Sequence, residues 1–312
     1  MTKTTFALIG TGIVGERIIN QALANEHCEI IAIYDENKER LQLIAEKYNL
    51  QAVESLQALF DTRPDWVYIG TPPVSHAPLA KLIAAQGLHV LSEKPLAHDA
   101  ADGEQMVAAV EQANVLHAMH FPMMYSPVVH ALKTAIQNNE LGDIVRVELH
   151  THFATWPRPW QQTPWIASRE QGGFIREVFP HYLQLTNHLF GDVTIQSHDT
   201  VYPADETLCE VGVTALGRTG DNIPLLLNGL GNIALEERLE YRVIGTKKVM
   251  TIRNWSELWV SEQGQPAVHV SATDIPSGLL QACHDKLQGE NPTLIDFNEG
   301  LKVQRWIDEL LK

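Results

Sequence analysis

The first 120 residues alternate between short apolar runs and longer segments with helical spacing. The apolar runs fall at residues 6–9, 29–34, 66–69, 89–91 and 115–119. The segments that favour helix lie between them, at residues 16–25, 37–48, 77–86 and 102–112. Strands and helices that alternate at this spacing predict βαβ units, and therefore a doubly wound parallel sheet with helices on both faces.

The pattern changes after residue 119. A helical segment at 128–137 is followed by alternating apolar and polar runs at 144–149, 193–201, 209–216, 223–227 and 241–244. Two further helices are expected at residues 279–287 and 294–311. Because little helix separates the last of the alternating runs, they predict a mostly antiparallel open sheet. We therefore expect an α/β chain with two domains, a parallel-sheet domain over residues 1–120 and an α+β domain over residues 121–312.

Composition narrows the class of protein. The chain has 312 residues, with 38 acidic and 23 basic side chains and a formal net charge of −15. This charge opposes nonspecific binding to nucleic acid and to anionic membranes. The three cysteines, Cys28, Cys209 and Cys283, are far apart and form no CxxC pair, which fits a reducing compartment better than a disulfide framework. With no signal peptide and no apolar stretch long enough to span a bilayer, the sequence predicts a soluble cytoplasmic protein.

A glycine-rich turn follows the first predicted strand. Gly10, Gly12 and Gly15 form the pattern G-x-G-x-x-G directly before a predicted helix. The first glycine permits a tight turn, the second lets the backbone approach a pyrophosphate, and the third allows close packing of helix on strand. The helix N-terminus then offers free N–H groups to the phosphates. The residues between the glycines, which would share this contact, are Thr11, Ile13 and Val14. The motif predicts a Rossmann domain that binds a dinucleotide.

Asp35 indicates which dinucleotide is preferred. It follows Gly15 by twenty residues, at the end of the second predicted strand, where a carboxylate accepts hydrogen bonds from the adenosine ribose. A carboxylate also repels a 2′-phosphate, so Asp35 favours NAD over NADP. Lys38 and Arg40 lie just beyond it and could weaken that preference. A second interpretation is that Asp35 is the N-cap of the helix at 37–48, a role that is compatible with binding ribose.

Two further loops are expected to face the cofactor, because each follows a parallel strand at its carboxyl end. Thr71-Pro72-Pro73, with His76 close behind, follows the strand at 66–69, and Glu93-Lys94-Pro95 follows the strand at 89–91. Together with the glycine-rich turn, these loops resemble the Gfo/Idh/MocA family, which is named for glucose–fructose oxidoreductase, inositol dehydrogenase and a rhizopine-catabolism protein. The resemblance implies cofactor binding by Thr71, Pro72, His76, Glu93 and Lys94.

The resemblance continues through the second half of the chain. Residues 141–144 look like the family's entry to its first strand there, residues 172–181 look like its Gly-rich signature with an acidic residue and a histidine, and residues 244–246 match a later turn. Membership implies an antiparallel sheet that often forms an oligomer interface, hence a homodimer or homotetramer. It also implies a final helix, here 294–311, that packs back towards the Rossmann domain.

The family resemblance also implies a mechanism. His181 matches the catalytic histidine, a general acid/base suited to either direction of hydride transfer because its ordinary pKa lies near neutrality. Lys94 matches a lysine that hydrogen-bonds the reacting oxygen and stabilises its developing charge. Glu177 occupies the position of an aspartate that orients the histidine.

This chain departs from the family pattern in three places. Glu177 is one methylene longer than the usual aspartate. Pro180 predicts that a helix starts there, so Glu177 and His181 are not expected to share one helix face. Residues 119–127 usually carry an arginine, where this chain has Met123-Met124-Tyr125. The substrate pocket is therefore expected to differ from that of the sugar and inositol enzymes.

The remaining candidates are weaker. His150 and His152 share one face of a predicted strand, but no third ligand is evident, so they are interpreted as ordinary strand histidines and no metal site is predicted. An aromatic, proline-rich loop contains Trp156, Pro157, Arg158, Pro159, Trp160 and Trp165. It could cap a sugar site or pack in a subunit interface. Arg169 and Arg176 could contact an anionic substrate or serve a structural ion pair.

Two functions follow from these observations. The first is an NAD(P)-dependent oxidoreductase that transfers hydride between nicotinamide and a hydroxyl or keto carbon of a sugar, cyclitol or related small molecule. The second is a non-catalytic NAD(P)-binding sensor or transcriptional co-regulator on the same scaffold. The presence of Lys94 and His181 favours the enzyme.

Overall fold

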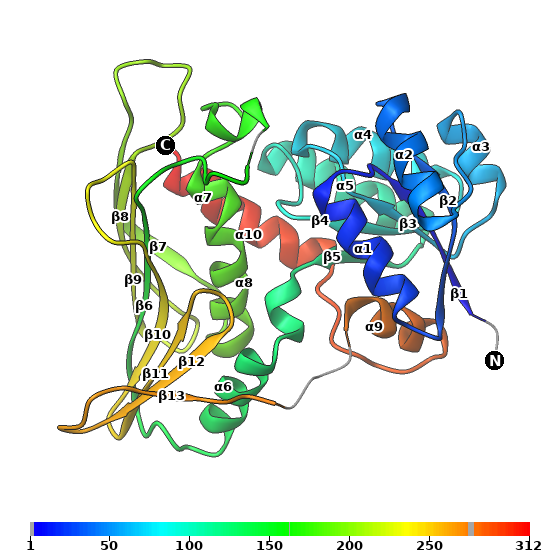
Figure 1. The fold of residues 1–312 in the computed structure, drawn as a ribbon. Coiled ribbons are helices and arrows are strands. Elements are labelled where there is room, and N and C mark those ends of the chain that lie inside the picture. The colour runs from blue at the N-terminus through cyan, green and yellow to red at the C-terminus, as the bar shows by residue number, and fades with distance from the viewer. Residues whose placement is uncertain (1–2, 162, 274–277) are drawn as a thin grey trace. The chain divides into compact units, whose positions relative to one another are not determined.

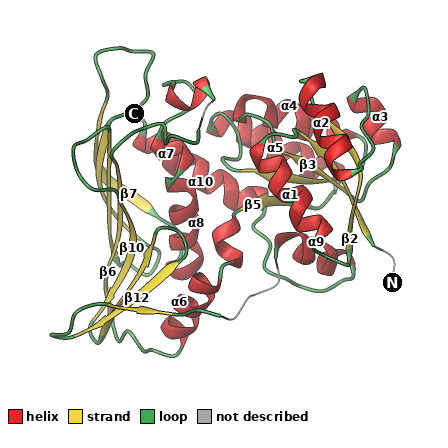
Figure 2. Ribbon diagram, in the orientation of Figure 1, coloured by secondary structure: helices red, strands yellow, loops and turns green. Residues whose placement is uncertain are grey.

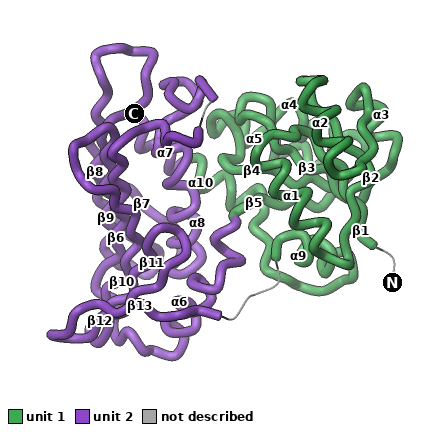
Figure 3. The backbone as a smooth tube through the Cα atoms, viewed as in Figure 1, with its two compact units in different colours: residues 1–121, 277–304 green, residues 122–276, 305–312 purple. Residues whose placement is uncertain are grey.

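The structure, a computed structural model, describes residues 3–161, 163–273 and 278–312. The chain forms two compact units, shown in green and purple in Figure 3. The N-terminal unit comprises residues 1–121 and 277–304, and the C-terminal unit comprises residues 122–276 and 305–312. Each unit has its own sheet.

The N-terminal unit contains a five-stranded parallel sheet in the order β2-β1-β3-β4-β5 (Figure 1). Its strands are β1 (Thr4–Ile9), β2 (Cys28–Tyr34), β3 (Trp66–Ile69), β4 (His89–Glu93) and β5 (His117–His120). Strands β3 and β4 are buried along nearly their whole length, as expected for a parallel sheet that helices cover on both faces. The predicted doubly wound parallel sheet is confirmed.

Helices connect these strands. They are α1 (Ile13–Leu23), α2 (Lys38–Tyr48), α3 (Leu56–Asp61), α4 (His76–Ala85), preceded by the 3₁₀ turn η1 (Pro73–Ser75), and α5 (Ala100–Ala113). Helix α1 begins at Ile13, inside the glycine-rich turn and three residues earlier than predicted. The short helix α3 and turn η1 were not predicted, because neither is long enough to show helical periodicity.

The N-terminal unit is completed by a segment from far along the chain. Helix α9 (Leu279–Leu287) and the first part of α10 (Phe297–Leu310) belong to it. The Met119 backbone N–H in β5 donates to the Ile295 carbonyl at 2.7 Å, and the Phe297 N–H donates to His117 Nδ1 at 3.0 Å. Thr4 at the start of β1 lies 2.9 Å from His284 Nδ1 of α9. The edge strand β5 and the inner strand β1 of the parallel sheet are thereby tied to this segment.

The C-terminal unit contains an eight-stranded sheet in the order β13-β12-β11-β10-β6-β9-β8-β7. Its strands are β6 (Ile144–Phe153), β7 (Thr194–Val201), β8 (Gly212–Arg218), β9 (Pro224–Gly231), β10 (Arg238–Gly245), β11 (Lys248–Arg253), β12 (Glu257–Glu262) and β13 (Val268–Val270). All neighbours are antiparallel except β6 and β9, so the predicted mostly antiparallel sheet is confirmed. Strands β11, β12 and β13 were not predicted.

Helices cover one face of this sheet (Figure 2). They are α6 (Pro127–Gln137), α7 (Phe174–Glu177) and α8 (Phe179–Phe190), with 3₁₀ turns η2 (Pro122–Tyr125) and η3 (Pro164–Ala167). Tyr182 of α8 stacks on Tyr241 of β10 with 5.6 Å between ring centroids. The side chains of β10 alternate between the two faces. The face opposite the helices carries Arg242, which pairs with Glu148 at 3.1 Å. We call this opposite face the outer face of the sheet.

Candidate active site

The glycine-rich turn is shaped by close packing at two of its glycines. Gly10 has φ = 96°, and a Cβ added there would lie 2.7 Å from the Gly70 carbonyl oxygen. A Cβ on Gly15 would lie 2.1 Å from the Gly10 carbonyl oxygen. At Gly12 a Cβ would meet nothing within 4 Å. Gly12 is also the N-cap of α1 and provides no side-chain cap, so the first N–H groups of the helix are available to an anion.

A pocket of about 560 Å³ opens over this turn, entirely within the N-terminal unit. Its lining includes five of the residues predicted to bind cofactor, namely Gly10, Gly12, Asp35, Thr71 and Pro72. The other lining residues are Ile9, Tyr34, Glu36, Leu56, Gly70, Val74, Ser75, Pro78 and Leu79. Open backbone at a helix N-terminus beside a carboxylate fits the pyrophosphate and ribose of a dinucleotide. Of the other predicted contacts, Thr11, Gly15 and His76 are buried, Val14 is partly exposed and Ile13 is exposed.

Asp35 is bonded to the glycine-rich turn itself. Its Oδ2 accepts the Thr11 backbone N–H at 2.7 Å and the Thr11 hydroxyl at 2.8 Å, and its Oδ1 accepts the Asn37 N–H at 2.9 Å. The N-cap of α2 is Asn37, whose side chain accepts the Arg40 N–H at 3.0 Å. The interpretation of Asp35 as this N-cap is therefore wrong. The helix starts two residues further on than that role requires, and Asp35 stays at the pocket wall.

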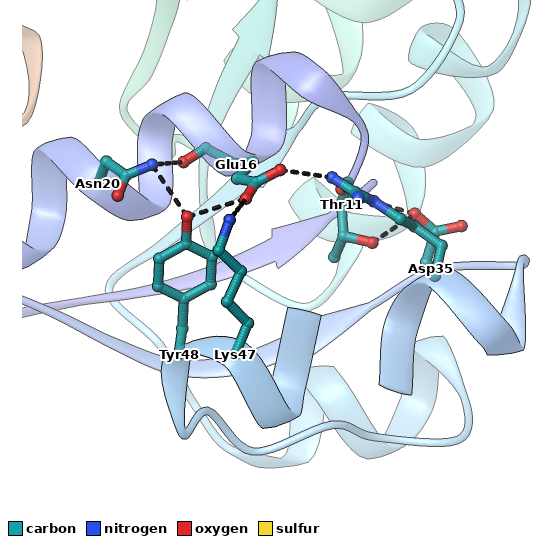
Figure 4. Close-up of polar contacts among 7 residues, drawn as sticks. Thr11, Glu16, Asn20, Asp35, Lys47 and Tyr48 are labelled. Carbon is teal, nitrogen blue, oxygen red and sulfur yellow. Dashed lines mark hydrogen bonds and ion pairs between the residues drawn. The ribbon is translucent and has the colours of Figure 1, made fainter. Parts of the chain in front are cut away.

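Glu16 gathers three side chains behind the turn (Figure 4). Arg40 Nη2 lies 2.6 Å from one carboxylate oxygen, while Lys47 Nζ at 2.6 Å and the Tyr48 hydroxyl at 2.9 Å donate to the other. Arg40 Nε also donates to the Thr11 carbonyl oxygen at 2.8 Å. We call these four residues the Glu16 cluster. The sequence alone did not indicate it, because α1 and α2 are brought together only by the sheet.

His76 links the two predicted cofactor loops. It begins α4, it is completely buried, and its Nε2 lies 2.8 Å from the Thr71 carbonyl oxygen. Its Nδ1 lies 3.1 Å from the carbonyl oxygen of Pro95, in the loop after β4. Burial lowers the pKa of His76, so the neutral imidazole is favoured near neutral pH. His76 thus supports the two loops from the protein interior, whereas Lys94 is partly exposed.

Glu93 forms a buried cluster at the carboxyl ends of three neighbouring strands. The Tyr68 hydroxyl of β3 donates to Glu93 Oε1 at 2.6 Å, and His120 Nδ1 of β5 contacts the same oxygen. Burial opposes the charged carboxylate, but His120, Tyr68 and Lys94 together lower the pKa of Glu93 to about 2. Glu93 is therefore an ionised carboxylate next to Lys94 in sequence. Tyr68 and His120 were missed by the sequence analysis, although Glu93 and His120 are directly paired in the β4–β5 register.

His181 lies in the first turn of α8, in the C-terminal unit. The helix begins at Phe179 with Pro180 in its first turn, which confirms the predicted helix start. Glu177 ends the separate helix α7, so the two residues do not share one helix. The His181 ring meets Trp255 edge-on at 5.3 Å, and Trp255 also stacks on Tyr182 at 5.4 Å. Trp255, in the turn between β11 and β12, has φ = 73°, a region that bulky residues seldom adopt.

Glu210 is a buried carboxyl group beneath the same segment. Its Oε1 accepts the Ile175 backbone N–H of α7 at 2.7 Å. Its other oxygen has no hydrogen-bond partner among the residues that the structure describes. Burial raises the pKa of Glu210 to about 7. Sequence reasoning missed this residue, because its partner lies 35 positions earlier in the chain.

The remaining candidates contact neighbouring residues of the same unit. Arg169 lies over the Tyr202 ring at 3.8 Å, and Arg176 donates to the Arg169 and Gly172 carbonyl oxygens. In the aromatic loop, Arg158 lies over the Trp156 and Trp160 rings. Within the described ranges, no group of three or more His, Cys, Asp or Glu side chains could hold a metal ion. No helix in the described parts of the chain is long and apolar enough to cross a membrane.

Comparison with known proteins identifies the family. Residues 4–121 match a model described as an oxidoreductase family, NAD-binding Rossmann fold, and residues 133–312 match the C-terminal alpha/beta domain of that family. D-apiose dehydrogenase of Paraburkholderia graminis is 28% identical over 192 residues, which are 60% of this chain and 50% of that protein. A dTDP-3,4-didehydro-2,6-dideoxy-α-D-glucose 3-reductase of Streptomyces violaceoruber is 27% identical over 195 residues, 61% of this chain and 56% of that protein.

These matches span about half the length of the curated relatives. Over nearly the whole chain, the fold is shared with the crystal structure of an oxidoreductase from Agrobacterium radiobacter in complex with NAD⁺, L-tartaric acid and magnesium. The TM-score is 0.84 at 19% identity, covering 98% of this chain and 95% of that one. With both of its domains matched, the chain belongs to the Gfo/Idh/MocA family of oxidoreductases and carries that family's NAD-binding Rossmann domain.

Proposed function

We propose that the protein is an NAD-dependent oxidoreductase that transfers hydride between nicotinamide and a hydroxyl or keto carbon of a sugar, cyclitol or related small molecule. The pocket over the glycine-rich turn carries this proposal. It combines uncapped N–H groups at the start of α1 with the Asp35 carboxylate, in a chain of an oxidoreductase family. NAD supplies the acceptor or donor of hydride when it is bound there.

In this proposal, the pyrophosphate and the adenosine ribose of the cofactor have separate partners. The turn around Gly12 binds the pyrophosphate, and Asp35 accepts hydrogen bonds from the adenosine ribose. His76 holds the Thr71 and Pro95 segments at a fixed spacing, so that Thr71 and Pro72 form one wall of the pocket. The charged side chains of the lining are Asp35 and Glu36, which favours NAD over NADP.

The catalytic roles are assigned to Lys94, His181 and Glu177. His181 takes the hydroxyl proton during oxidation and returns it during reduction. Lys94 donates a hydrogen bond to the reacting oxygen and stabilises its developing negative charge. Glu177 orients or charge-tunes the histidine from the end of α7.

The substrate class is inferred from the relatives, which are named as a dehydrogenase and a reductase of sugars. These names give no support to the alternative of a non-catalytic sensor or co-regulator. We further propose a cytoplasmic homodimer or homotetramer formed through the outer face of the C-terminal sheet. Leu216 and Val201, each about half exposed, would be covered there. Light scattering of the purified protein tests this assembly.

The experiment that tests the function measures nicotinamide absorbance with sugars, inositols, polyols and their keto forms, using NAD and NADP in parallel. We expect turnover with at least one member of the panel, lost in both Lys94→Ala and His181→Ala while NAD binding is kept. Full activity in His181→Ala would refute the acid/base assignment. Failure to bind NAD(H) at all would refute the oxidoreductase proposal.

A further inference from the structure

We propose that Glu16 is a specificity-determining residue that holds Arg40 away from the adenosine end of the cofactor and so enforces the preference for NAD. The inference rests on the proposed function only in taking the pocket over the glycine-rich turn as the cofactor site. It assigns a role to a residue outside the pocket lining.

The Arg40 side chain is held by hydrogen bonds to two acceptors. The Arg40 guanidinium donates through Nε to the Thr11 carbonyl and through Nη2 to the Glu16 carboxylate. Both acceptors belong to the glycine-rich turn and to helix α1, and Arg40 does not line the pocket. A guanidinium that is bonded in this fork geometry cannot offer the same donors to a phosphate.

The Glu16 carboxylate is well suited to retain Arg40. Its second oxygen accepts from Lys47 and Tyr48, so the carboxylate is held in place from two directions (Figure 4). The hydrogen bond from Lys47, with those from Arg40 and Tyr48, outweighs the opposing effect of burial and lowers the pKa of Glu16 to about 2. Glu16 therefore stays charged at physiological pH and withholds Lys47 as well as Arg40.

The pocket that results is anionic. Asp35 and Glu36 line it, and Arg40, two residues beyond the Lys38 that begins α2, does not. A 2′-phosphate adds about two negative charges and would face both carboxylates. Lys38 is a second cation to consider, and its Nζ lies 4.9 Å from the ring centroid of Tyr34, which lines the pocket. Releasing Arg40 would provide the bidentate partner that a 2′-phosphate requires.

The test is a calorimetric titration of NAD⁺ and NADP⁺ into the full-length protein and its variants. In Glu16→Gln and Glu16→Ala, we expect the ratio of the NADP⁺ to the NAD⁺ dissociation constant to fall about tenfold, the size of one charged hydrogen bond. Adding Arg40→Gln to either variant should restore the wild-type ratio. Glu39→Gln, which removes an exposed carboxylate from α2 without touching Arg40, is the matched control and should change nothing.

Three outcomes would overturn the inference. They are an unchanged ratio in both folded Glu16 variants, an equal fall in Glu39→Gln, or reversal by Lys38→Gln rather than by Arg40→Gln. Thermal melting of each variant confirms that it is folded. A wild-type protein that binds neither dinucleotide would instead refute the proposed function, so the two failures are distinguishable.

Discussion

The Tyr68 hydroxyl donates a 2.6 Å hydrogen bond to the buried carboxylate of Glu93, on the oxygen that His120 also contacts. Three neighbouring strands thus contribute one side chain each to a charged cluster inside the N-terminal unit. Burying an ionised carboxylate is costly unless it is paired and hydrogen-bonded. The fold therefore depends on His120 and Tyr68 as the hydrogen-bonding partners of Glu93.

Replacing His120 by asparagine should reveal this dependence. The variant leaves the buried Glu93 carboxylate without its imidazole partner, and we expect the free energy of unfolding at pH 7 to fall by about 3–5 kcal/mol. The double variant Glu93→Gln/His120→Asn should be more stable than His120→Asn alone, because no buried charge remains. Urea unfolding followed by circular dichroism measures both, and equal stabilities of the two variants would contradict the pairing.

The buried Glu210 carboxyl group should make the stability of the protein depend on pH. Burial raises the pKa of Glu210 to about 7 in the folded chain, above its ordinary value of 4.5. Between these values the unfolded chain has lost a proton that the folded chain keeps, so stability falls as the pH rises from 4.5 to 7 and then levels off. Glu210→Gln, which keeps an acceptor for the Ile175 N–H, should remove this slope and stabilise the protein at pH 8 by about 1–3 kcal/mol.

The matched variant for this position is Glu210→Ala. It also removes the ionisation, but it leaves the Ile175 N–H without its acceptor, so it should be less stable than Glu210→Gln by about 1–3 kcal/mol at every pH. A Glu210→Gln variant with the wild-type pH slope would show that another group titrates there.

The two glycines of the turn that follow Gly10 should respond differently to alanine. At Gly15 the added methyl would lie 2.1 Å from a backbone oxygen, and we expect a loss of about 3 kcal/mol or more in stability. At Gly12 the methyl would point into open space, so stability should change by less than about 1 kcal/mol while NAD affinity falls at least tenfold. Thermal melting and NAD titration of both variants provide the comparison, and unimpaired NAD binding by folded Gly12→Ala would exclude the pyrophosphate assignment.

His76 is expected to matter for both stability and cofactor binding. His76→Ala removes the side chain that bridges the Thr71 and Pro95 carbonyl groups, and should cost about 2–4 kcal/mol in stability. Because the loop carrying Thr71 and Pro72 then loses its support, NAD affinity should fall as well. Calorimetry below the melting temperature measures that loss, and an unchanged affinity would mean that the pocket wall is held by other contacts.

The sequence predicts the parallel sheet well because each of its strands is a short apolar run bounded by a helix of ordinary length. It misses β13, whose three side chains are all exposed, because an exposed edge strand has no burial pattern. The glycine-rich turn and Asp35 could be located from spacing alone. The Glu16 cluster and the pair of Glu210 with Ile175 could not, because each joins elements that only the fold brings together.

The segment that completes the N-terminal unit is synthesised late, after all the strands of the second sheet. Strand β5 is synthesised at residues 117–120, but the Ile295 carbonyl that accepts the Met119 N–H follows more than 170 residues later. A nascent chain can therefore finish the whole eight-stranded sheet before its NAD-binding unit is closed. An expression fragment cut after Phe121 lacks α9 and the start of α10 permanently, and its β5 keeps an open edge that invites aggregation. The dinucleotide-binding unit is thus completed only by residues that are made after the strands of the second sheet.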